Sequence, residues 1–401
     1  MSMRLWKPMK RIGVLALLIL ATGCSTFTST PRGTVRPDSI RGVWVDSWGH
    51  GFYTKQQCDD LLEWCEDAGI NTILIEVRKV GDAYYTSNLE PRGRNEETGK
   101  PIESTFDPLE YLCNAVRKQD GLRLEAWIVA NRIWKGSAAP TPGWPEHPVS
   151  AHPESVLIDN KGGTTLGEGE AKSVFVDPSD PAVAAHLARV AADIVRRYPV
   201  DAIHLDYIRY PGKNWGYGPR SLARFAAATG NRQVPAPDDS EFTRWRAAQV
   251  TAMLRRVKAA IRSERLGVDL TVATIAWGDP SNESYKKTAL YTRTMQDWPA
   301  WCDEKLVDIA YVMHYRDESK ADQAAKYREW FRTFMSHRGR GKARIVIGQG
   351  AYKNSISDTV RQIEDALDAG FDGFCLFSYR SPNSGTAART EAAHAFREFA
   401  R

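Results

Sequence analysis

The residues best placed to do chemistry lie in residues 200–211, a segment with the composition of a short buried strand. Because side chains alternate along a strand, His204 and Asp206 share one face, and the apolar Ile203 and Leu205 share the other. A carboxylate among apolar neighbours costs free energy unless a reaction or a hydrogen-bond network uses it. Asp206 is therefore a candidate catalytic group, with a purely structural aspartate as the alternative.

Two other β-rich runs also carry polar or aromatic side chains along one face. They place Glu76 and Arg78 in residues 72–78, with Asp82 just beyond, and Glu125 and Trp127 in residues 122–127. Three separate strands that each end in inward polar groups predict one shared site. Further candidates at the ends of other expected strands are Asp46, Asp279, His314, Asp317, Gln349 and Tyr379.

Several carboxyl groups around one cleft are what glycoside hydrolysis requires. One carboxylic acid must protonate the leaving oxygen while another carboxylate stays anionic. We expect Asp206 to be the nucleophile or general base, with Arg78 and His204 orienting it. The candidates for the acid, in order of preference, are Glu76, Glu125 and Asp279. Burial or a neighbouring anion would raise the pKa of the acid into a useful range.

Aromatic residues gather at the expected strand ends and in two long connections, where their rings could stack on the apolar faces of sugars. They are Trp44, Trp48, Trp127, Trp134, Trp144, Trp215, Tyr217 and Trp277. Packing within the fold is the alternative for some of them. Trp215 and Tyr217 are expected in exposed loops, which favours a binding role for these two.

The elements that must position these residues alternate between β-rich runs and stretches with helical spacing. The eight strand candidates are residues 42–48, 72–78, 122–129, 202–208, 269–277, 308–315, 344–350 and 373–379. Eight strand and helix pairs predict an α/β fold, a (β/α)8 TIM barrel. A doubly wound open sheet is the alternative, but the glycine fingerprint is missing after the first strand.

Two connections, residues 130–180 and 211–240, are too long to be plain loops. They follow the third and fourth strands, so both lie on the face where barrel enzymes do chemistry, and we expect them to wall a cleft. The first one contains a possible extra strand at residues 173–176. It then reads as a turn and a helix start at residues 177–181.

The first 24 residues have a different composition from the rest of the 401-residue chain. Four basic residues precede the apolar run 12–21, and small residues lead to Cys24. This pattern predicts a lipoprotein signal peptide over residues 1–24, lipidated at Cys24, with simple secretion as the alternative. Residues 25–38 then form a flexible tether, and residues 39–401 form the barrel domain. Removal of the signal lowers the formal net charge from +5 to +1.

Other chemistries find little support in the sequence. The HxH and HExxH patterns of zinc hydrolases are missing, as are the GxSxG elbow, a phosphate loop and a basic stripe for nucleic acid. The five cysteines that remain after Cys24 are widely spaced, which argues against a disulfide scaffold. A single bridge between Cys65 and Cys113 stays open. We therefore expect no metal and no cofactor.

Several motifs together resemble the family-10-like bacterial glycosyl hydrolases, many of which are lipoproteins. The motifs are residues 41–44, 76–78, 81–85, 106–109, 126–127, 131–132, 201–211, 348–353 and 377–380. The resemblance covers residues 40–400 and implies a TIM barrel. Some members are similar to enzymes that cut peptidoglycan glycan strands stripped of their peptides.

The chain also departs from the pattern that this resemblance implies. It has Glu76 where Gln is expected, Glu125 where His is common and Met313 where Gln is usual, so the cleft gains acids. A chitinase-like DxxDxDxE motif is incomplete, because Ile208 stands at its terminal Glu position. Together with the strand-end analysis, the resemblance gives these substrate-binding candidates: Arg78, Asp82, Trp127, Asn131, His204, Tyr207, Trp277, His314, Gln349 and Tyr379.

The sequence thus predicts a glycoside hydrolase of the cell envelope that acts on peptidoglycan glycan strands. We expect a monomer, anchored by lipid on Cys24 to the outer membrane and facing the periplasm. The residue after the lipidated cysteine, Ser25, favours that destination. Two alternatives are a non-catalytic glycan-binding lipoprotein and a hydrolase of an exogenous polysaccharide.

Overall fold

The computed structural model describes residues 36, 38–96, 98–103, 105–136, 140, 144–168, 172–279, 284–337, 343–380 and 385–400. The expected signal peptide, with Cys24, and nearly all of the expected tether lie outside these residues. The described residues belong to one compact unit. Among them, no helix combines the length and the apolar character needed to cross a membrane.

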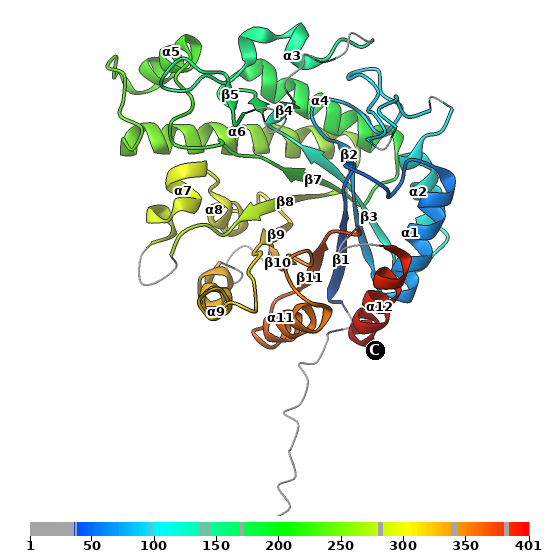
Figure 1. Cartoon of the computed structure of the whole chain (residues 1–401). Helices are drawn as coiled ribbons and strands as arrows, with labels where there is room; N and C mark the ends of the chain where they lie inside the picture. Colours follow the sequence, from blue (N-terminus) through cyan, green and yellow to red (C-terminus); the bar gives the residue numbers. More distant parts are fainter. Residues whose placement is uncertain are drawn as a thin grey trace, which may run out of the picture. The chain divides into compact units, whose positions relative to one another are not determined.

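Eight parallel strands close into a barrel, as predicted (Figure 1). In order around the barrel from β1 they are β1 (Ile40–Val45), β11 (Gly373–Phe377), β10 (Arg344–Gln349), β9 (Ile309–Met313), β8 (Asp269–Ile275), β7 (Ala202–Asp206), β3 (Arg123–Val129) and β2 (Thr72–Arg78). Each strand pairs with both neighbours, so the doubly wound open sheet is ruled out.

The strands are apolar on both faces because both faces are covered. All seven residues of β2, for example, are buried. Alternate side chains fill the barrel interior, among them Trp44, Leu74, Trp127, Tyr311 and Val346. The other face of each strand packs against the surrounding helices in a larger apolar cluster. This alternation fixes which polar residues face the interior of the barrel.

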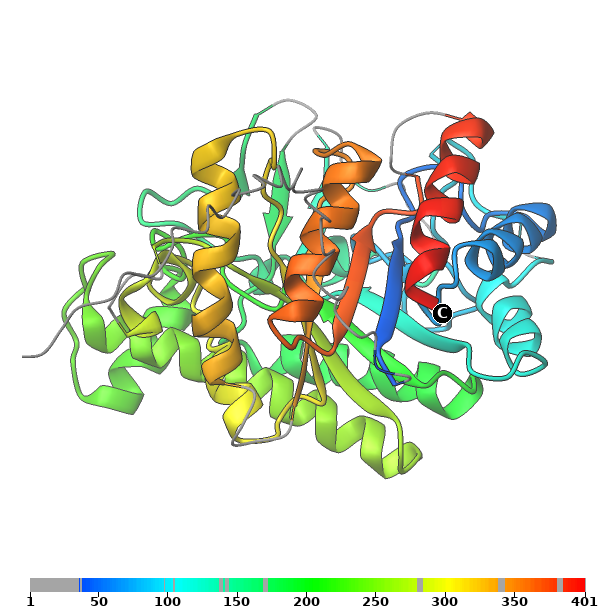
Figure 2. The same ribbon diagram turned by 90° about the horizontal axis from the view of Figure 1, so that it is seen from below.

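The helices follow the strands along the chain. They are α1 (Lys55–Asp67), α2 (Pro108–Val116), α4 (Pro181–Arg197), α5 (Pro219–Thr229), α6 (Ser240–Glu264), α7 (Ala289–Thr294), α8 (Trp298–Asp303), α9 (Ala321–Ser336), α11 (Ile356–Asp368) and α12 (Gly385–Arg397). Figure 2 shows α9, α11 and α12, coloured yellow-orange to red, on the outside of the strands. Side chains cap several N-termini; Asp180, for instance, accepts the N–H of Ala182 at the start of α4.

The connection after β3 carries a small antiparallel sheet of its own. Its strands are β4 (Arg132–Lys135), β6 (Ser173–Phe175) and β5 (Thr165–Leu166), with β6 in the middle. The predicted extra strand at residues 173–176 is β6. A short helix, α3 (Pro148–Ala151), lies in the same connection, and α5 forms part of the connection after β7. Because β4 starts three residues after β3 ends, its side chains stay close to the barrel mouth.

A buried ion pair fastens β2 to the loop that follows it. The Arg78 guanidinium donates to both carboxylate oxygens of Glu90 at 2.7–3.0 Å, and also to the carbonyls of Val129 and Ala130. Both charged side chains are at most 2% exposed, and His186 lies 2.8 Å from the same carboxylate. Burial disfavours the charged carboxylate, but the charge and hydrogen bonds of Arg78 together with those of His186 outweigh burial and hold the pKa of Glu90 well below its usual range.

Glu90→Ala leaves the Arg78 cation buried without its partner, and we expect the free energy of unfolding to fall by about 3–5 kcal/mol. Urea denaturation at neutral pH measures this loss. The matched control is Glu304→Ala, which removes the exposed pair with Arg255 and should cost under about 1 kcal/mol. If both variants lost the same free energy of unfolding, the Arg78–Glu90 pair would not be a buried pair that stabilises the fold.

Candidate active site

Glu76 lies on β2 and points into the mouth of the barrel at the carboxyl ends of the strands. Its side chain is 1% exposed, and one carboxyl oxygen, Oε2, accepts two hydrogen bonds of 2.8 Å from Ser47, through N and Oγ. Burial and the nearby charge of Asp46 raise the pKa of Glu76 to about 7, although the Ser47 bonds act in the opposite direction. A carboxyl group with this pKa can hold a proton near neutral pH and release it to a leaving group.

A second acid, Asp46, stands beside Glu76 and is held differently. β1 and β2 pair with Val45 opposite Ile75, so the next residues, Asp46 and Glu76, are neighbours. Arg380 donates to both Asp46 oxygens, at 2.6 and 3.3 Å, and forms an ion pair with it. Two adjacent carboxyl groups in unlike environments are a recurrent way to separate an acid from an anion.

Asp206 is the last residue of β7 and faces the same mouth. Its carboxylate is 6% exposed and accepts the N–H of Tyr207 at 2.6 Å and the Arg209 guanidinium at 3.3 Å. Tyr207 has φ of 51°, a left-handed conformation that is costly for a residue with a side chain. Such strain concentrates at functional sites. Here it accompanies a sharp change of chain direction that brings Arg209 against the carboxylate.

The strand register relates Asp206 to Glu76. Glu76 pairs with Trp127 of β3, and Asp206 pairs with Val129 of the same strand. β3 therefore separates the two acids. Two strand spacings across the sheet and an offset of two residues along β3 place their backbones roughly 12 Å apart. Because both side chains point inward, their carboxyl groups face the same mouth from either side of β3. Two carboxyl groups that face one mouth are the first requirement of two-acid catalysis.

His204 and Glu125 lie deeper in the barrel, in a chain of hydrogen bonds below the mouth. The Trp44 indole N–H donates to His204 Nε2 at 3.1 Å, which leaves Nδ1 to donate to Thr271 Oγ1 at 2.9 Å. Thr271 in turn donates to Glu125 at 2.6 Å. Burial lowers the pKa of His204 to about 3, so the ring is neutral.

These contacts change the roles expected for three residues. The hydrogen bonds of His204 go to Trp44 and Thr271 instead of Asp206, so the ring carries no charge to orient that acid. Arg78 was expected beside Asp206, but it pairs with Glu90 instead. Arg209 is the cation that binds Asp206. The fully buried carboxylate of Glu125 is bound by Arg123 at 2.9 Å and by the Tyr311 hydroxyl at 2.8 Å, away from the mouth.

Three of the expected substrate-binding residues point away from the barrel interior. His314 is stacked on Tyr327 of α9, and its Nε2 lies 3.0 Å from the Tyr327 carbonyl. Gln349 donates to the Tyr327 hydroxyl at 2.7 Å. Tyr379 packs edge-on against Trp64 of α1. They belong to the packing between barrel and helices, so their expected contact with substrate is incorrect for this arrangement.

The remaining expected residues lie at or around the mouth. Trp127 fills the interior of the barrel near its mouth, and its indole N–H has no hydrogen-bond partner among the described residues. Asn131 donates to the carbonyl of Arg209 at 3.2 Å, and Asp82 accepts the N–H of Val80 at 3.0 Å. Asp279 lies in an exposed segment after β8. Trp277, in that same segment, is 47% exposed.

The aromatic residues of the second long connection are buried, contrary to expectation. Trp215 is 5% and Tyr217 9% exposed. Tyr217 packs edge-on against Phe242 of α6, and Arg246 of the same helix donates to the carbonyl of Trp215 at 2.7 Å. These rings anchor the connection to α6, which explains them without a sugar.

Sequence reasoning missed three groups that the structure brings to the mouth. The first is Arg209, which forms an ion pair with Asp206. Arg132 donates to the Tyr207 hydroxyl at 3.1 Å, and its guanidinium lies 4.3 Å from the Tyr207 ring. Tyr315 is stacked on Phe377, and its hydroxyl is buried with no hydrogen-bond partner among the described residues. In the sequence, Arg132 belongs to the motif 131–132 of the family resemblance and Tyr315 is the last residue of the expected strand 308–315, but neither pattern assigns a role to the side chain.

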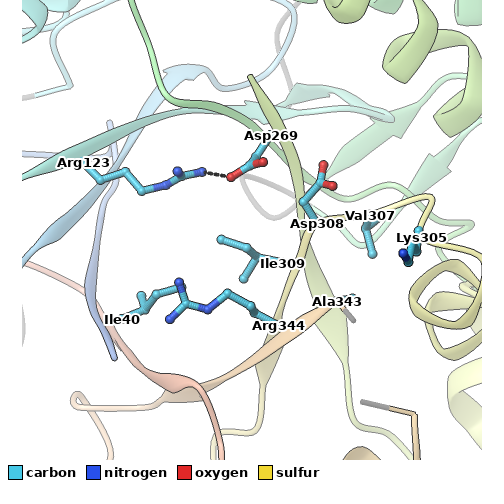
Figure 3. Close-up of a pocket in the computed structure, with 9 residues that line it drawn as sticks. All are labelled: Ile40, Arg123, Asp269, Lys305, Val307, Asp308, Ile309, Ala343 and Arg344. Carbon is cyan, nitrogen blue, oxygen red and sulfur yellow. Dashed lines mark hydrogen bonds and ion pairs between the residues drawn. The ribbon is translucent and has the colours of Figure 1, made fainter. Parts of the chain in front are cut away.

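A cavity of about 290 Å³ lies at the opposite end of the barrel (Figure 3). It is lined by residues at the starts of strands, among them Ile40, Asp269, Ile309 and Arg344, and the Arg123–Asp269 ion pair of 2.7 Å lies at its edge (Figure 3). In TIM barrels this end serves stability, whereas chemistry is done at the other end. Within the described part of the chain, no group of three acidic, histidine or cysteine side chains could hold a metal ion.

The five described cysteines, Cys58, Cys65, Cys113, Cys302 and Cys375, are buried free thiols. The bridge between Cys65 and Cys113 that the sequence left open is therefore not formed. Burial raises the pKa of Cys65 and of Cys113, so neither thiol is primed to react.

Comparison with known proteins places the chain among carbohydrate-active barrels. Glycosyl hydrolase DigH of Escherichia coli K12 is 24% identical over 312 residues, which cover 75% of this chain and 66% of DigH. Glycosyl hydrolase YngK of Bacillus subtilis 168 is 22% identical over 333 residues, 78% of this chain and 61% of YngK. The chain thus spans slightly less than two thirds of these relatives.

Solved structures share the fold at low sequence identity. The PgaB glycoside hydrolase domain from Bordetella bronchiseptica matches with a TM-score of 0.60 and 12% identity, over 89% of this chain and 98% of that domain. The catalytic domain of a β-amylase from Paenibacillus polymyxa also matches with a TM-score of 0.60, at 14% identity, over 90% of this chain and 99% of that domain. Finally, the model of the family described as Glycosyl hydrolase-like 10 matches residues 39–364 of this chain. The chain belongs to the glycosyl hydrolase-like 10 family.

Proposed function

We propose that this protein hydrolyses glycosidic bonds, with Glu76 as the proton donor and Asp206 as its anionic partner. The observation that carries the proposal is the buried Glu76 carboxyl, whose pKa is raised to about 7 at the same mouth that holds Asp206. Family membership and the names of the relatives agree with this chemistry. Glu125 and Asp279 are poorer candidates for the proton donor, because Glu125 is bound by Arg123 and Tyr311 below the mouth and Asp279 lies in an exposed segment.

The proposed reaction uses the two carboxyl groups on opposite sides of one bond. Glu76 gives its proton to the glycosidic oxygen as the bond from this oxygen to the anomeric carbon breaks. Asp206 either attacks that carbon, forming an ester that water then hydrolyses, or takes a proton from the water that attacks it. The first route retains the anomeric configuration and the second inverts it. Arg209 keeps Asp206 in position throughout.

The proposed substrate is the glycan of peptidoglycan from which the peptides have been removed. This choice rests on the resemblance of the sequence motifs to the family-10-like bacterial glycosyl hydrolases, and on the lipoprotein signal expected over residues 1–24. That signal also underlies the proposed location, an outer-membrane lipoprotein that faces the periplasm and is anchored through Cys24. A glycan-binding protein without catalysis and a hydrolase of an exogenous polysaccharide are the outcomes that would replace this proposal.

Asp206→Asn should lower kcat about 10²–10⁴-fold, because the amide cannot act as an anion or base. Glycan binding should persist, since Asn retains the size of the side chain. Reducing-end release from purified, peptide-free glycan strands measures the rate, and co-sedimentation with the insoluble polymer measures binding. The matched control, Asp279→Asn in the exposed segment after β8, should keep activity near the wild-type level. A wild-type protein that cuts no glycan would instead support the binding protein.

Glu76→Gln should abolish cleavage of unactivated glycans but spare substrates with an acidic phenol leaving group, because such a group departs without protonation. In the wild type, kcat/KM should decline as the pH rises through about 7, since only protonated Glu76 can donate. The variant should lack this decline on the phenol substrate. The same pH profile for variant and wild type would rule Glu76 out as the acid.

Glu76 also links stability to pH. Its pKa is higher in the folded state, at about 7, than the ordinary value of 4.5, so the native state favours the protonated form. The contribution of Glu76 to stability is complete below about pH 4.5 and is lost as the pH rises through about 7. The free energy of unfolding of Glu76→Gln, measured by urea denaturation and taken relative to wild type, should therefore rise by about 3 kcal/mol between pH 4.5 and pH 8. If the difference in unfolding free energy between variant and wild type does not change with pH, the pKa of Glu76 is not raised in the folded protein.

A further inference from the structure

Three cationic side chains gather around one indole ring at the barrel mouth. The Nζ atoms of Lys79 and Lys135 lie 4.2 and 4.1 Å from the ring centre of half-buried Trp48, and Arg132 Cζ lies 5.6 Å from it. They come from separate parts of the chain, since Lys79 follows β2 and the other two belong to β4. We call Lys79, Arg132 and Lys135 the Trp48 cation cluster.

The positive charge of this cluster is only partly neutralised. Lys79 forms an ion pair with Glu96. In the described ranges, Arg132 and Lys135 have no carboxylate within the 4.0 Å of an ion pair. Contact with an aromatic ring supplies about 0.5–1 kcal/mol at a partly exposed site, which compensates poorly for like charges held together. An anion from outside would stabilise the arrangement.

The cluster also has a hydrogen-bond donor to spare. Arg132 uses Nη1 to reach the Tyr207 hydroxyl, but its Nε is buried and has no partner among the described residues. The Lys135 side chain is exposed, so its ammonium group is accessible. Arg132 and Lys135 both lie against the Trp48 ring, and a guanidinium group and an ammonium group near one ring suit an anion with two oxygens, such as a carboxylate.

The cluster adjoins both proposed catalytic acids. Trp48 directly follows Ser47, which binds Glu76, and the Arg132 charge acts on the pKa of Glu76. Arg132 also contacts Tyr207, the residue after Asp206. An anion held here would belong to a sugar next to the bond that is cut. The Trp48 ring is correspondingly surrounded by cations, which leaves it less able to stack on a sugar.

We infer that the Trp48 cation cluster binds a carboxylate of the glycan, so that the substrate is an acidic polysaccharide. This inference rests on the proposed glycosidase function and specifies its substrate class. Peptide-free peptidoglycan glycan qualifies, because removing the peptide exposes a carboxyl on every second sugar. A polymer of uronic acids offers the same chemical group from a different position on the ring.

The test compares native peptide-free glycan strands with strands whose carboxyl groups have been reduced to alcohols. Wild type should cut the native strands with a kcat/KM at least about tenfold higher, the equivalent of one charge-assisted contact, and the difference should lie mainly in KM. It should shrink as salt is added, because the cluster is partly exposed. A uronic acid polymer, tested in parallel, shows which carboxyl group is recognised: the ether-linked carboxyl of the peptide-free peptidoglycan glycan, or the carboxyl on the sugar ring of a uronic acid.

Lys135→Met should lose most of the preference for native strands while cutting reduced strands at the wild-type rate. The matched control is Lys118→Met, at an exposed position after α2, which should keep the full preference. Equal cleavage of native and reduced strands by wild type would overturn the carboxylate site and leave the glycosidase proposal intact. Cleavage of neither strand nor of the uronic acid polymer would overturn both.

Discussion

The burial of one carboxyl group beside an ion-paired neighbour is the feature on which the proposed chemistry depends. Glu76 is enclosed by the barrel and receives two hydrogen bonds from Ser47, while Asp46 next to it is bound by Arg380. If Glu76 were exposed to water, its pKa would return toward its ordinary value of 4.5 and little acid would remain at neutral pH. Closure of the barrel provides this enclosure, because it brings the ends of eight strands around one mouth.

The layer below the mouth supports the acids without taking part in the proposed reaction. The hydrogen bonds that run from Trp44 through His204 and Thr271 to Glu125 link β1, β7, β8 and β3. Each buried polar group in this chain has a partner, so the interior of the barrel gains rigidity at little desolvation cost. The position of Asp206, two residues beyond His204, depends on that support.

Much of the fold could be predicted from the sequence. The eight β-rich runs, separated by stretches with helical spacing, gave the eight strands, and strand alternation placed His204 and Asp206 on the inward face. The same alternation shows why His314 and Gln349 are not at the mouth. Each directly follows an inward position, Met313 or Gly348, and therefore points outward to α9.

The partners within the site could not be predicted in the same way. Glu90, which binds Arg78, lies in a loop whose path depends on tertiary contacts. Arg209 binds Asp206 just after the left-handed residue Tyr207, a backbone conformation that strand alternation does not predict. The neutral state of His204 follows from burial, and the cluster around Trp48 from the packing of β4 near the mouth.

The most direct test of this account is a measurement of the pKa of Glu76 itself. Carbon NMR of protein labelled at the glutamate carboxyl carbons, titrated from pH 3 to pH 9, would follow each side chain, and the resonance missing from Glu76→Gln identifies the one of interest. The account predicts a midpoint of about 7 that falls when Asp46→Asn removes the neighbouring charge. A midpoint near 4.5 would show that Glu76 is ionised at neutral pH and cannot serve as the acid.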